Sequence, residues 1–186
     1  MISASGVLAD VPVLSALVWA VVFVGPMLLA SFLVADVPSW LVIVTAAAFG
    51  FIQEGIIQVN SAEDYVEDRE LGVRTLAVSI GLPRAITVTL AAIAAGGGAL
   101  LATVAWSLAT RRVPPVGWLA IVPVAAICAG AAVWVARLRR GIARMGLDES
   151  VARVKRAGRL VPLWLTLVAW ATLTSAAVSF LAGRPA

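Results

Sequence analysis

The sequence predicts an all-α fold, a multispanning transmembrane helical bundle, and three observations lead to this prediction. Of the 186 residues, 62% are hydrophobic and only 13% are charged, and the mean hydropathy is +1.02. Five apolar stretches approach or exceed the roughly 20 residues that a helix needs to cross a bilayer. The cationic residues cluster in the short segments between these stretches. These features exclude an ordinary soluble domain, and despite a net charge of +4 they argue against a nucleic-acid partner.

We interpret residues 1–186 as a single membrane domain with about five spans, surrounded by membrane lipids. In chain order the predicted spans are residues 11–35, 37–59, 85–110, 113–136 and 160–183. The first carries no charge and is longer than the apolar core of a signal peptide, which is typically about 7–15 residues, so we expect it to be retained. The third contains Gly96, Gly97 and Gly98, small residues that let helix backbones approach closely in a bundle.

A carboxylate interrupts the second span at Glu54, between Gln53 and Gln58. A charged group inside a bilayer is costly, so it is expected to face a cavity or a partner. These three residues are therefore candidates for lining an intramembrane cavity. The alternative is that Glu54 lies near the membrane interface and is partly hydrated.

The segments between the spans predict the orientation. In a five-span topology the N-terminus, residues 60–84 and residues 137–159 share one side, which carries eleven Lys and Arg residues against three on the other. The positive-inside rule therefore places residues 60–84 in the cytoplasm, as in a bacterial inner membrane. Within the basic stretch, Leu147, Val151 and Val154 predict a short helix with an apolar stripe suited to the membrane surface. The basic residues there either attract a diphosphate or act only as a topology signal.

The one acidic cluster follows the second span. Five of the ten acidic residues lie between Glu63 and Glu70. Asp64 and Asp68 are four residues apart and share one face of a helix. If the helix continues from the span, Gln53, Asn60 and Glu67 lie with them in one sector of about 100°. Carboxylate and amide oxygens at this spacing suit Mg²⁺. The alternative is an acidic, solvated loop. The chain has no histidine and one cysteine, so other metal-binding chemistry is scarce.

The residues around this cluster carry a family resemblance. The run N-x-x-x-D-x-x-x-D-R-x-x-G-x-R-T-L-A-V-x-x-G, from Asn60 to Gly81, resembles the second aspartate-rich motif of the UbiA superfamily of intramembrane prenyltransferases, most closely of members that prenylate quinone precursors. The resemblance implies that Asp64 and Asp68 hold Mg²⁺, with Asn60 as a further oxygen ligand. It also implies that Arg74 and Arg69 contact the diphosphate of a prenyl diphosphate.

The resemblance implies transfer of a prenyl group to a lipophilic, aromatic, quinone-precursor-like acceptor. Complete members of the superfamily carry an earlier aspartate-rich motif, whereas here only Asp10 and Asp36 precede Glu54. The chain therefore resembles the C-terminal portion of such an enzyme, and we expect a partner chain with the first motif to be needed for catalysis. Two alternatives remain: a non-catalytic protein that binds prenyl lipids or assists assembly, and a small ion- or proton-coupled transporter that uses Glu54.

Overall fold

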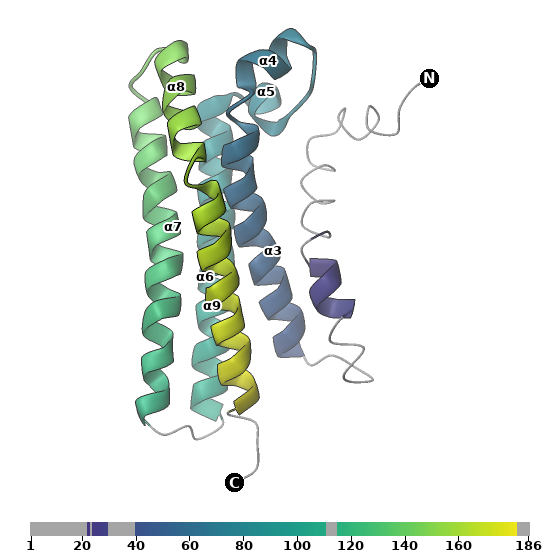
Figure 1. The fold of residues 1–186 in the computed structure, drawn as a ribbon, viewed down its shortest axis with the longest axis vertical. Coiled ribbons are helices and arrows are strands. Elements are labelled where there is room, and N and C mark those ends of the chain that lie inside the picture. The colour runs from purple at the N-terminus through teal and green to yellow at the C-terminus, as the bar shows by residue number, and fades with distance from the viewer. Residues whose placement is uncertain (1–21, 23, 30–39, 111–114, 182–186) are drawn as a thin grey trace.

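The computed structural model describes residues 22, 24–29, 40–110 and 115–181, and these contain helices and no strand. The prediction of an all-α membrane bundle is confirmed, because four helices are long and apolar enough to cross a bilayer. They are α3 (Trp40–Ser61), α6 (Leu82–Thr110), α7 (Ile121–Ile142) and α9 (Val161–Leu181) (Figure 1). Each of the last four predicted spans falls on one of them. Of the first predicted span, only residues 22 and 24–29 are described, and they are helical.

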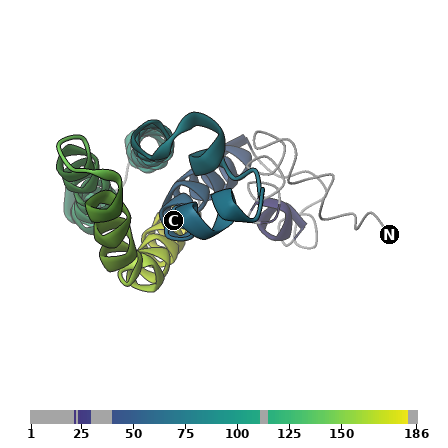
Figure 2. The ribbon, with the colours of Figure 1, turned by 90° about the horizontal axis from the view of Figure 1, so that it is seen from above.

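Four shorter elements connect the long helices. They are α4 (Tyr65–Glu70) and α5 (Leu76–Ile80) after α3, the 3₁₀ helix η1 (Pro115–Ala120) before α7, and α8 (Leu147–Gly158) between α7 and α9. Figure 1 shows α4, α5 and α8 together at one end of the bundle, with the end of α6 and the start of α7 at the opposite end. Seen from above in Figure 2, α8 covers the α7 side of this end and α4 with α5 covers the α3 side. The acidic and basic segments therefore meet at the same end.

The closest packing in the bundle is between α3 and α6. A Cβ atom placed on Gly96 would lie only 2.6 Å from the carbonyl oxygen of Ala48, and one placed on Gly55 would lie 2.8 Å from Cγ1 of Ile93. Both helices therefore use a glycine to bring their backbones together, as the small residues of the third predicted span had indicated. By contrast, no atom lies within 4 Å of a Cβ placed on Gly98.

Polar and aromatic contacts join α9 to its neighbours. The side-chain amide of Gln53 on α3 donates a hydrogen bond to the carbonyl oxygen of Leu165, at 3.2 Å. The rings of Trp134 on α7 and Trp164 on α9 are stacked with their centroids 5.8 Å apart, and Gly130 leaves room for the Trp164 ring. These contacts fix α9 between α3 and α7.

The structure corrects the expectation for the helix in the basic stretch. Val151 and Val154 of α8 are buried inside the protein, and only Leu147 of the predicted stripe is exposed. The Ser150 hydroxyl donates to the carbonyl oxygen of Ile142 at 3.4 Å, and a side chain on Gly141 would overlap the guanidinium group of Arg153. The apolar side of α8 therefore packs on the bundle rather than on the membrane surface, because α7 extends far enough to receive it.

Candidate functional site

Residues 63–70, which we call the aspartate segment, do not continue the helix of the second predicted span. Helix α3 ends at Ser61, a turn closes with a 3.0 Å hydrogen bond from the Glu63 amide to the Asn60 carbonyl oxygen, and α4 begins after Asp64. The prediction of one continuous face from Gln53 to Asp68 is therefore wrong. Asp64 and Asp68 still share a helical turn, because the Asp68 amide donates to the Asp64 carbonyl oxygen at 2.7 Å.

The chain after α4 turns back toward Asp68. Gly72 has a φ of 71°, a left-handed conformation that favours glycine, and the Val73 amide donates to the Asp68 carbonyl oxygen at 2.8 Å. The Thr75 side chain caps α5 by accepting from the Val78 amide at 3.3 Å. This turn brings the Thr75 hydroxyl close to the Asp68 carboxylate.

The four carboxylates between Glu63 and Asp68 divide into two groups, which we call the aspartate edge (Asp64 and Asp68) and the glutamate edge (Glu63 and Glu67). At about 100° per residue, Asp64 and Asp68 are about 40° apart around α4, and Glu67 lies about 60° to the other side of Asp64. Glu67 pairs with Lys155 of α8 at 2.8 Å, and Glu63 packs directly on Gly158, where an added side chain would overlap its carboxylate. Within the described residues, neither aspartate forms an ion pair.

The electrostatics follow from this division. Partial burial, and next the charge of Asp64, raise the pKa of Asp68, while the Thr75 side chain opposes the shift. The hydrogen bond from Lys155 lowers the pKa of Glu67. The pKa of Glu63 is raised, first by burial and then by Asp64. The aspartate edge therefore holds mutually repelling negative charge that a bound cation would relieve.

The aspartate edge fits a hydrated divalent cation better than a protein-enclosed one. Asp64 is exposed and Asp68 half-buried, so both carboxylates are accessible from water. No group of three or more potential metal-binding acidic, histidine or cysteine side chains converges in the described part of the chain. Asn60 is exposed on the last turn of α3, and nothing in the described contacts brings its side chain to the aspartates. Mg²⁺ would take two ligands here and the rest from water and substrate oxygens.

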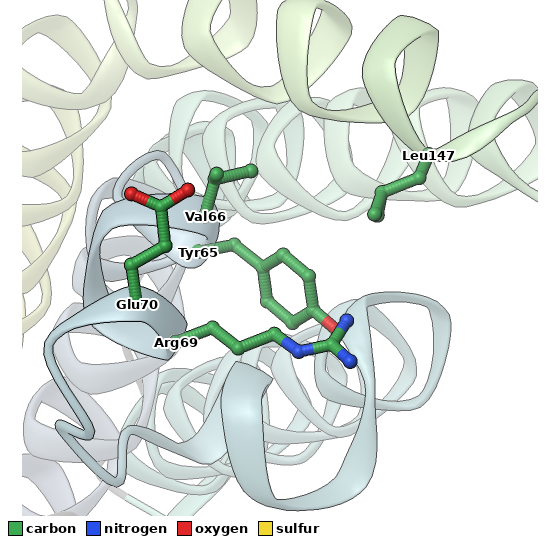
Figure 3. Close-up of a pocket in the computed structure, with 5 residues that line it drawn as sticks. All are labelled: Tyr65, Val66, Arg69, Glu70 and Leu147. Carbon is green, nitrogen blue, oxygen red and sulfur yellow. The ribbon is translucent and has the colours of Figure 1, made fainter.

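Neither of the two arginines implied by the resemblance forms an ion pair with a carboxylate among the described residues. Arg69 and Tyr65 line an open cleft of about 320 Å³ (Figure 3). Val66, Glu70 and Leu147 complete the lining of this cleft. Arg74 is exposed and forms no ion pair within the described residues. The cation that does reach the acidic segment is Lys155, which sequence reasoning had not singled out from the basic stretch.

The three residues predicted to line an intramembrane cavity, which are Gln53, Glu54 and Gln58, lie in two different environments. Glu54 is only 7% exposed, so the protein covers nearly all of its side chain. Its Oε1 atom accepts a 2.5 Å hydrogen bond from Gln58, and its buried Oε2 atom has no hydrogen-bond partner. Gln53 instead donates to α9. Glu54 lies seven residues before the end of α3, about 10 Å of helix rise from the aspartate segment, so it does not belong to the aspartate edge.

Comparison with known proteins gives one match. The sequence model of the UbiA prenyltransferase family matches residues 5–145, which is more than half of the chain and includes the whole aspartate segment. No curated protein and no solved structure matches the chain at a significant level. The matched range contains α3, α6 and α7 and the segment from Asn60 to Gly81, where the resemblance had been found.

Proposed function

The chain belongs to the UbiA prenyltransferase family, and from this we propose that it takes part in Mg²⁺-dependent transfer of a prenyl group from a prenyl diphosphate to a lipophilic, quinone-precursor-like acceptor. The observation that carries the proposal is the aspartate edge. Asp64 and Asp68 stand together without an ion-pair partner among the described residues, at the end of a bundle of membrane-spanning helices. This is where a lipid chain in the bilayer and a diphosphate in water would meet.

The residues have separable tasks in this proposal. Asp64 and Asp68 would hold Mg²⁺, which when bound neutralises the diphosphate and stabilises its charge as the leaving group. The packing of Glu63 on Gly158 would keep the start of α4 on α8, so that the aspartates face the substrate. The apolar helices would exclude water from the allylic cation formed when the bond to diphosphate breaks. The family match favours this reading over a transporter that uses Glu54.

The proposed site is incomplete in the described residues. Only two carboxylates share the aspartate edge, and the sequence before Glu54 contains no second aspartate cluster. We therefore propose that a partner chain carrying a first aspartate-rich motif completes the Mg²⁺ and diphosphate site. The non-catalytic alternative, binding of prenyl lipids, would need only the half-site. The excess of cations at this end of the bundle supports a cytoplasmic location for it.

The proposal is tested by binding of farnesyl diphosphate to the purified chain with and without Mg²⁺. Asp64→Asn and Asp68→Asn each remove one metal ligand without changing side-chain size. Loss of even an outer-shell partner typically weakens metal binding by about 10- to 100-fold, so each variant should lose at least that much. Asp148→Asn, at an exposed aspartate on α8, is the matched control and should bind like the parent. Unchanged Mg²⁺-dependent binding in both test variants would refute the metal assignment.

A further inference from the structure

Lys155 makes the one ion pair found among the described residues, and it makes it beside the aspartate edge. Its Nζ atom lies 2.8 Å from Oε1 of Glu67. The hydrogen bond from Lys155 to Glu67 raises the pKa of the ammonium group, and the charges of Asp64 and Glu63 raise it further. Lys155 is therefore a permanently charged group within electrostatic range of the proposed metal ligands.

The ion pair is placed where it can be exchanged. The Lys155 and Glu67 side chains are 46% and 52% exposed, and ion pairs this accessible to water contribute little to stability. Helix α8 does not depend on the pair for its position, because Val154 is fully buried and Gly158 packs on Glu63. A lysine ammonium on a flexible four-carbon stem can turn to a new partner while its helix stays in place.

We propose that Lys155 is a diphosphate-binding residue that leaves Glu67 for the substrate when a prenyl diphosphate occupies the aspartate edge. The inference rests on the proposed function and adds a substrate contact from α8. The oxygens of a diphosphate beside Asp64 would compete with the Glu67 carboxylate for the ammonium group, and they carry more negative charge than one carboxylate. Glu67 thus acts as a stand-in for the substrate in the free protein.

The two members of the ion pair should then have opposite effects on binding. Farnesyl diphosphate binding is measured at saturating Mg²⁺, which removes any effect of Glu67 on metal occupancy. Lys155→Gln should weaken binding about tenfold, the loss expected for one charge-assisted contact. Glu67→Gln frees Lys155 and should leave binding equal or tighter. Arg156→Gln is the control, because Arg156 is an exposed cation on the same helix whose one hydrogen bond within the described part of the chain goes to the carbonyl oxygen of Ala152.

A purely structural ion pair gives a different pattern. Lys155→Gln and Glu67→Gln would then change binding in the same direction and by similar amounts, and this result would overturn the inference. It would also be overturned if Lys155→Gln binds like the parent, or if Arg156→Gln loses as much. Melting temperatures of the two variants should match, because both lose the same contact. Absence of Mg²⁺-dependent binding in the parent would instead refute the proposed function, and the inference with it.

Discussion

The interface between α3 and α6 and the contact between α4 and α8 hold the same protein together by opposite means. At the first, Gly55 and Gly96 bring two backbones within contact distance, and the nearest atoms that the two glycines meet carry no charge. At the second, an exposed ion pair joins Lys155 to Glu67, and a glycine on α8 receives the Glu63 carboxylate. The interface between α3 and α6 cannot change without separating the two helices. The ion pair beside the aspartates, by contrast, can exchange partners while α4 and α8 stay in place.

The difference indicates which part is scaffold and which part is site. Close backbone packing in a bilayer has one geometry, because interiors at this density do not deform continuously. An ion pair open to water has several geometries of similar free energy. A site that must bind and release a highly charged substrate benefits from the second kind of contact, provided that the first kind fixes its position.

The largest effect on stability is expected at the interface between α3 and α6. Gly96→Ala places a methyl group 2.6 Å from a backbone oxygen that cannot rotate away. Overpacking of this kind typically costs about 1–3 kcal/mol, so the free energy of unfolding in detergent should fall by that amount. Gly98→Ala is the matched control, since its methyl group would meet no atom within 4 Å. Equal stability of the two variants would show that α3 and α6 are not packed this closely.

A smaller effect, on binding more than on stability, is expected at the contact between α4 and α8. Gly158→Ala would overlap the Glu63 carboxylate and displace it, and we expect the turn before α4 to shift with it. Farnesyl diphosphate binding should weaken a fewfold because the aspartate edge shifts with α4. Glu63→Ala makes room for the added methyl group, so the double variant should bind no worse than Glu63→Ala alone. If Gly158→Ala weakens binding equally in both backgrounds, the contact is not responsible.

The smallest effect is a pH dependence. The pKa of Asp68 is raised in the folded protein by partial burial and then by Asp64, so the folded state retains a proton that the unfolded state has already lost. The metal-free protein should therefore lose stability as the pH rises from the ordinary aspartate pKa of about 3.9 through the raised value. Melting curves without Mg²⁺ should show this, and Asp68→Asn should reduce it. An identical profile in the variant would assign the effect to another group, such as Glu63.

The fold was predictable because the bilayer imposes strong constraints on sequence. Apolar length alone located the helices α3, α6, α7 and α9, and the small residue Gly96 indicated a close helix contact. The apolar stripe of α8 was recognised correctly but assigned to the wrong partner. Val151 and Val154 suit a membrane surface and a protein surface equally well, and the sequence does not say that α7 extends far enough to receive them.

The candidate site was predictable only in part. Asp64 and Asp68 do lie one helical turn apart, as predicted, because this spacing depends on a single turn. Their predicted alignment with Asn60 required one unbroken helix, but α3 ends at Ser61 and α4 begins at Tyr65. The contact with Lys155 spans 88 residues, and no local pattern distinguishes this lysine from the arginines around it.

The central claim is that the aspartate edge is half of a prenyltransferase site. It is tested most directly by prenyl transfer from farnesyl diphosphate to a quinone precursor in membranes. The chain is assayed alone and together with a partner chain that carries a first aspartate-rich motif. The account predicts no Mg²⁺-dependent product from the chain alone, and product from the pair that Asp68→Asn abolishes. Robust Mg²⁺-dependent transfer by the chain alone, lost in Asp68→Asn, would contradict it and show that one aspartate motif suffices.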